Sequence, residues 1–230
     1  SYNSDCDLNN IYVDDQSNIY VTGFLYGKYT IDNQTYEGVH RSGIIIKLDS
    51  SGNILWHYRN ADNTNFNGHH SIVAGLYPDN SGFIYATGSM DNGSDNQFVL
   101  KLNKETGQLI KGLYKHLPGR ASDIAPGEDG EFITCSFNVR KGNANILTLA
   151  KFDEDLNLKD HIEMSSTDNF NDGHVIYDLK YDGSSNIYIA GFFDGSLRFG
   201  VGQPYEVNSR SRSPFLAQYD YDLNFKNLYR

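Results

Sequence analysis

The hexapeptide NIYVTG at residues 18–23 returns almost unchanged at two later places in the chain. Residues 186–191 read NIYIAG, residues 83–88 read FIYATG, and residues 131–136, EFITCS, are a weaker fourth copy. Each copy is a short run of β-branched and aromatic residues that ends at glycine or serine, as expected for a β-strand. Copies that recur about every 50–65 residues predict a repeat architecture.

Three further apolar runs accompany each copy, so the repeat contains four predicted strands, A to D. The hexapeptide belongs to strand B, and short polar turns that can form hairpins join A to B and C to D. Strand A is predicted at 8–13, 72–77, 121–126 and 175–180, strand C at 43–49, 98–103, 148–153 and 215–220, and strand D at 53–59, 108–114, 156–164 and 223–229. Each repeat is therefore expected to be a four-stranded antiparallel meander.

The sequence thus predicts an all-β fold, a β-propeller of four-stranded antiparallel blades, with four blades in this chain. Consecutive apolar residues such as Ile19, Tyr20 and Val21 fit this fold, because a blade buries both of its faces against neighbouring blades. We expect one propeller over residues 1–230. Its blades are predicted at about 7–60, 70–116, 120–165 and 174–230.

The pattern NIYVTG…IIKLDSSGNILW resembles the bacterial β-propeller repeat called the SBBP repeat, and residues 191–220 resemble its variant with a long B–C insertion. The resemblance covers nearly the whole chain, and its motifs specify strands and turns. It implies a secreted or cell-surface propeller and assigns no catalytic residue. Because proteins with this repeat generally have more than four blades, we expect further blades or domains of the same polypeptide, or a larger assembly, as partners.

Composition excludes several classes of partner. The formal net charge of -10 argues against nucleic acid and anionic membranes, and no apolar run reaches the roughly 20 residues of a membrane span. The two cysteines, Cys6 and Cys135, lack zinc-site spacing, and Cys135 is predicted to be a small buried hydrophobe. No cofactor is predicted. Asp-rich turns at 48–53, 91–96 and 153–157 leave Ca²⁺ as an alternative, but they lack the EF-hand pattern and suit ordinary turns.

Length variation points to the B–C and D–A connections as the ligand face. The B–C connections at 25–42 and 194–214 are the long ones, and the D–A connections 63–70 and 166–174 share Asn-Phe-Asn followed by Gly-His. Binding function tends to lie on loops carried by a rigid scaffold. The candidate ligand contacts are Tyr26, Tyr29, Tyr36, His40, Arg41, Asn67, His69, Asn171, His174, Phe199, Tyr205, Arg210 and Arg212. The alternative for each of them is a structural role in its own loop.

These features predict a non-catalytic extracellular module that binds other proteins or surface glycans, or that acts as a structural spacer. Tyr-rich loops suit such contacts, because tyrosine offers a large contact area at low entropic cost. The alternative function is a polysaccharide lyase or hydrolase that uses the central channel. No nucleophile, zinc-protease or phosphate-binding motif is present. Carboxylates with shifted pKa values on the A strands would favour the enzyme.

Overall fold

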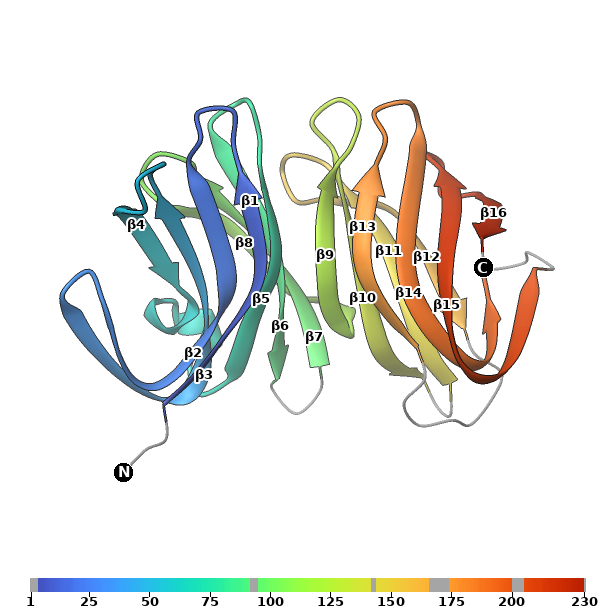
Figure 1. Ribbon diagram of the computed structural model, residues 1–230, viewed down its shortest axis with the longest axis horizontal. Helices are drawn as coiled ribbons and strands as arrows, with labels where there is room; N and C mark the ends of the chain where they lie inside the picture. The colour runs from blue at the N-terminus through green and yellow to red at the C-terminus, as the bar shows by residue number, and fades with distance from the viewer. Residues whose placement is uncertain (1–3, 92–94, 142–143, 166–173, 200–204, 230) are drawn as a thin grey trace. The chain divides into compact units, whose positions relative to one another are not determined.

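The computed structural model describes residues 4–91, 95–141, 144–165, 174–199 and 205–229. These residues form sixteen β-strands and two short 3-10 helices, which confirms the predicted all-β class. The chain divides into two compact units, Ser1–Leu117 and Pro118–Arg230 (Figure 1). In the described part of the chain, no helix has the length and apolar character of a membrane span.

The first unit contains two four-stranded antiparallel sheets, each a meander of sequence neighbours. Their order is β1-β2-β3-β4 and β5-β6-β7-β8. The strands of the first sheet are β1 (Asp5–Val13), β2 (Ile19–Ile31), β3 (Gln34–Leu48) and β4 (Ile54–Arg59); those of the second are β5 (His70–Pro78), β6 (Phe83–Asp91), β7 (Asp95–Asn103) and β8 (Leu109–Pro118). The short helices η1 (Asn60–Asp62) and η2 (Thr64–Phe66) lie between the two sheets in sequence. Tyr20 and Ile45 of the first sheet share one core with Val73, Leu76 and Phe98 of the second.

The second unit repeats the two meanders but joins them into one eight-stranded sheet. Its strands are β9 (Arg120–Pro126), β10 (Phe132–Lys141), β11 (Ala144–Phe152), β12 (Leu158–Ser165), β13 (Val175–Tyr181), β14 (Asn186–Arg198), β15 (Glu206–Asp220) and β16 (Phe225–Tyr229). The prediction of four separate four-stranded sheets is therefore wrong, because the described residues form three sheets. The cause is local: β14 is long enough for Arg198, at its end, to pair with Ser165 at the end of β12.

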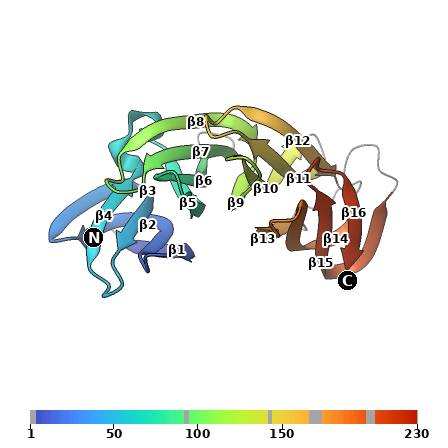
Figure 2. The same cartoon turned by 90° about the horizontal axis from the view of Figure 1, so that it is seen from above.

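The long B–C connections are also more regular than predicted. Residues 25–42 continue the ladder of β2 and β3 as a hairpin that curls away from the sheet (Figures 1 and 2, blue). Its turn is Asp32–Asn33, with φ of 47° and 60°, and aspartate and asparagine tolerate this left-handed backbone better than most residues. In the second unit, β14 and β15 stay paired as far as Arg198 and Glu206. The irregular loops expected there are thus largely strand.

Candidate functional site

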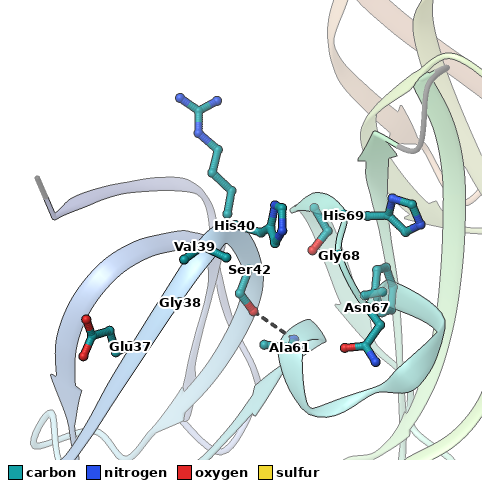
Figure 3. Close-up of a pocket in the computed structure, with 12 residues that line it drawn as sticks. Glu37, Gly38, Val39, His40, Ser42, Ala61, Asn67, Gly68 and His69 are labelled. Atoms are coloured by element: carbon teal, nitrogen blue, oxygen red, sulfur yellow. Dashed lines mark hydrogen bonds between the residues drawn. The ribbon is translucent and has the colours of Figure 1, made fainter. Parts of the chain in front are cut away.

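A pocket of about 540 Å³ opens in the first unit between the β2–β3 hairpin and the connection from β4 to β5. One wall is formed by residues 37–42 of β3. The other wall comes from Ala61, from residues 66–69 and from Ser71 at the start of β5. Figure 3 shows the two walls facing each other, with the Ser42 side chain directed at Ala61. A B–C element and a D–A element therefore meet at one site.

The hairpin wall exists because the ladder between β2 and β3 slips. Leu25 pairs with Ser42, but Gly27 pairs with Gly38, so residues 39–41 stand opposite Tyr26 alone. Gly27 has a φ of 78°, a backbone conformation in which a side chain would be strained. Such a bulge takes its extra residues out of the ladder and turns their side chains in a new direction. The bulge carries Val39, His40 and Arg41 to the pocket.

The second wall is held by a buried aromatic plug. Phe66 is 3% exposed, and its ring packs against Phe98 and Tyr114 with centroids 4.9 and 5.3 Å away. This anchor leaves Asn67 and His69 at the pocket. The Asn-Phe-Asn segment therefore has a structural role through Phe66, and its second asparagine, Asn67, lines the pocket.

Hydrogen bonds tie the two walls together. The Ser42 hydroxyl accepts the Ala61 N–H at 3.0 Å, and the Ser71 hydroxyl accepts the Gly43 N–H at 3.1 Å. Beside them, the Arg41 N–H donates to His70 Nδ1 at 3.0 Å, which assigns that nitrogen as the unprotonated one. Ser42 and Ser71 were not predicted as site residues, because nothing in a single sequence marks which serines will lie on facing connections.

Polar groups without partners lie at this site. His40 packs edge-on against His70, with ring centroids 5.1 Å apart, and its buried Nδ1 has no hydrogen-bond partner among the described residues. Asn60 precedes Ala61 and is not part of the pocket lining; it is fully buried, and neither its amide nitrogen nor its oxygen is paired within the described chain. Buried polar atoms are normally hydrogen-bonded, so both residues are exceptions to that rule.

The structure brings together four of the predicted residues of the first unit: His40, Arg41, Asn67 and His69. It places the three tyrosines elsewhere. Tyr36 stacks on Tyr29 with centroids 5.7 Å apart, and its hydroxyl is 3.1 Å from His57 Nε2. The Arg59 guanidinium lies 3.7 Å from the Tyr36 ring centre and donates to the Tyr29 hydroxyl. Tyr26 is paired with Asp5 on β1. Tyr29 and Tyr36 thus hold the hairpin to β4, and none of the three tyrosines lines the pocket.

In the second unit the predicted residues fall into different environments. Phe199 is fully buried and packs on Phe215 and Phe225, so the prediction that it contacts ligand is wrong. His174 is also buried, 4% exposed, just before β13. Tyr205 is 45% exposed against Phe225. Arg210 and Arg212 lie on β15; Arg212 is exposed, and the side chain of Arg210 is outside the described part. Asn171 lies outside the described residues.

A cluster of charged groups links β9 to β13 and was not found from the sequence. Lys180 Nζ lies 2.7 Å from Asp178 Oδ1 and 3.5 Å from Asp123 Oδ2, and the Leu179 N–H donates to Asp123 at 3.2 Å. Burial raises the pKa of Asp123 to about 6, although the Lys180 ammonium opposes that rise. The sequence shows these aspartates only as single polar residues within two predicted A strands.

The Asp-rich turns use their carboxylates internally. In five turns, at Asp14, Asp49, Asp153, Asp182 and Asp220, one carboxylate oxygen accepts the backbone N–H of the asparagine four residues on. The other oxygen accepts from that asparagine's side chain. Hydrogen bonds from the Asn53 and Asn186 side chains lower the pKa of Asp49 and Asp182 respectively. No group of three or more His, Cys, Asp or Glu side chains in the described residues is placed to hold a metal ion.

Comparison with known proteins adds little. No family model matches the chain, and no curated protein is a significant match. Among solved structures, the quinohemoprotein alcohol dehydrogenase from Comamonas testosteroni is similar, with a TM-score of 0.45 and 13% identity over 94% of this chain. The match spans 43% of that dehydrogenase, which is less than half of its length. Likeness at this level carries no information about activity or ligand, and membership of the SBBP repeat family stays a prediction.

Proposed function

We propose that this chain is a non-catalytic binding module of the β-propeller type that acts outside the cell and takes a glycan in its first-unit pocket. The propeller assignment is supported by four antiparallel meanders of the same strand order along one chain. The glycan assignment is carried by one observation, the pocket between the β3 bulge and the β4–β5 connection. Its volume is in the range of small-ligand sites.

The chemistry of the lining favours a sugar over a protein surface. Asn67, His69 and His40 offer donors and acceptors of the kind that hydrogen-bond hydroxyl groups. The aromatic residue of the lining, Phe66, is buried in the core, so it cannot serve as the exposed aromatic anchor typical of protein interfaces.

Acid–base cleavage of a polysaccharide is the second candidate, and the Asp123–Asp178–Lys180 cluster is the observation that favours it. Asp123 has a raised pKa and lies on an A strand, as expected of a catalytic carboxyl group. Its side chain is only 5% exposed, however, and is occupied by Lys180 and the Leu179 N–H. That environment suits a structural group better than one that must reach a substrate.

One experiment tests both candidates. The protein is incubated with immobilised neutral and acidic polysaccharides, and retention and the release of new reducing ends are both measured. We expect retention on at least one polysaccharide without cleavage, and at least a tenfold loss in the Asn67→Ala/His69→Ala variant, on the order of two lost hydrogen bonds. Asn80→Ala, in an exposed turn outside the pocket, is the matched control and should bind normally. Absence of retention, or equal retention by the pocket variant, would overturn the proposal, and new reducing ends that disappear in Asp123→Asn would establish the enzyme.

A further inference from the structure

An exposed arginine beside a phenylalanine ring occurs at equivalent strand positions in two meanders, the first of the first unit and the last of the second. The Arg41 guanidinium carbon lies 4.7 Å from the centre of the Phe24 ring, and that of Arg212 lies 4.1 Å from the centre of the Phe192 ring. Phe24 and Phe192 each follow the final glycine of a hexapeptide copy. The two arginines are the third residues of two equivalent bulges.

The bulges match residue for residue. In the first unit, residues 39–41 stand opposite one residue of β2, between the pairs Leu25–Ser42 and Gly27–Gly38. In the second unit, residues 210–212 stand opposite Asp194, between the pairs Phe193–Ser213 and Gly195–Ser209. The glycine beside each bulge has nearly the same left-handed backbone, with φ of 78° at Gly27 and 75° at Gly195. The β6–β7 ladder runs in unbroken register and has no such bulge.

Each guanidinium carbon lies over a phenylalanine ring, a contact that does not use the N–H groups of the guanidinium and leaves them for a ligand. This geometry suits a carboxylate, which a guanidinium can bind through two parallel hydrogen bonds. Arg41 is 47% exposed, and its ion pair with Asp5 is long, at 3.7 Å, between two exposed groups, so the pair contributes little to stability. Within the described residues, the Arg212 guanidinium contacts the Phe192 ring. In a chain of net charge -10, two such arginines are local cationic points on an acidic molecule.

The groups around each arginine indicate what carries the carboxylate. Arg41 is one of the residues that line the pocket, as are His40, Asn67, His69 and one acidic residue, Glu37. Beside Arg212, the ring of Tyr177 is 66% exposed and lies 5.5 Å from the Phe192 ring centre, so an aromatic face is available next to the cation. Hydroxyl-binding side chains and an open aromatic face suit an acidic sugar.

We propose that the glycan ligand is acidic, with uronic acid residues, and that Arg41 and Arg212 each bind a carboxylate of such a ligand at separate sites. The first of these sites rests on the proposed function of the pocket, whereas the second, at Arg212, stands on its own geometry. The chain then offers two carboxylate sites, one in each unit. An acidic peptide could present the same carboxylate, and the experiment separates it from a uronate.

The test is calorimetric titration of the whole chain with a galacturonate oligosaccharide and with its neutral methyl ester. We expect two sites for the acid and at least tenfold weaker binding of the ester. Arg41→Gln and Arg212→Gln should each leave one site, and the double variant none. Lys28→Gln and Arg198→Gln remove one exposed positive charge from the same two hairpins and should retain both sites. Asp5→Asn should tighten the Arg41 site, because it removes the competing carboxylate.

The outcomes are distinct. Equal binding of acid and ester, unchanged stoichiometry in both arginine variants, or equal losses in the control variants would overturn the inference. Binding of a poly-glutamate peptide in place of the galacturonate would overturn the uronate assignment. If a neutral glycan binds through Asn67 and His69 and ignores Arg41, the proposed function stands and this inference fails. If no glycan is bound, both fail.

Discussion

Gly191 shows why the hexapeptide copies end in glycine. A Cβ atom at this position would lie 2.0 Å from the Val175 carbonyl oxygen, and at Gly88 it would lie 2.2 Å from that of Ile72. Both glycines face a bulge in the neighbouring A strand, which pushes a carbonyl towards the B strand. In the third copy, Ser136 occupies the same register, and its hydroxyl is bonded to Thr148. The backbone is therefore tight at the glycines and open enough at Ser136 for a side chain.

Gly191→Ala should destabilise the protein, because the added methyl group must displace backbone rather than a mobile side chain. We expect the free energy of unfolding to fall by about 1–3 kcal/mol, the usual cost of overpacking. Gly38→Ala is the matched control, since the nearest atom to its Cβ would be 3.7 Å away, in ordinary contact. Urea denaturation of both variants measures the difference. If Gly191→Ala is as stable as Gly38→Ala, the backbone around residue 191 must move away from the added methyl group without a loss in the free energy of unfolding, which would contradict this expectation.

Among the structural elements, the strands could be predicted from sequence and the bulges could not. Strands A to D are visible because each is a run of β-branched and aromatic residues between turn residues. The sequence of the β2–β3 hairpin favours a loop, because Tyr, Thr, Lys and Gln alternate there without an apolar core face, although Asp32–Asn33 is a recognisable hairpin turn. The bulge at 39–41 depends on the register between two strands. Register cannot be read from a single sequence. His40 and Arg41 were therefore predicted as single contacts, and the bulge that carries both of them was not predicted.

The contact between β9 and β13 should make stability depend on pH through Asp123. Its pKa is raised in the folded chain to about 6, above the unfolded value near 3.9, so the folded state binds the extra proton between these values. This contribution to stability is complete below about pH 4 and is lost as pH rises to about 6. We expect a loss on the order of 2 kcal/mol over this window from Asp123 in the wild type, and the absence of this loss in Asp123→Asn.

Urea denaturation at intervals from pH 4 to pH 7 checks this expectation. Asp160→Asn, an exposed carboxylate outside the cluster, is the control and should keep the wild-type slope. The hydrogen-bonded carboxylates of the Asp-rich turns act in the opposite direction. Because the pKa of Asp49 and of Asp182 is lowered, their contribution is lost only below the usual range of aspartate, outside this window. An unchanged slope in Asp123→Asn would contradict the assignment.

Across the whole molecule, the same strand position holds the meanders of each unit together. Lys47 on β3 is 3% exposed and donates to the Lys104 carbonyl, in the turn between β7 and β8, at 3.1 Å. Lys151, at the equivalent position of β11, donates to the Tyr221 carbonyl, between β15 and β16, at 2.9 Å. In the last meander the position is Gln218, which instead bonds to Asn186 and Tyr229 of its own meander. In each unit, therefore, a lysine on the third strand of the first meander is hydrogen-bonded to the turn between the last two strands of the second meander.

Lys151→Met should weaken this attachment in the second unit. Its ammonium also lies 4.3 Å from the centre of the Tyr221 ring, so the variant loses a hydrogen bond and a cation–π contact and leaves a carbonyl unpaired. We expect a loss of about 1–3 kcal/mol in the free energy of unfolding, because methionine keeps the apolar stem but not the donor. Lys159→Met, an exposed change of the same type on β12, should have almost no effect. If the two variants are equally stable in urea, the free-energy penalty of desolvating Lys151 is as large as the stabilisation from its contacts.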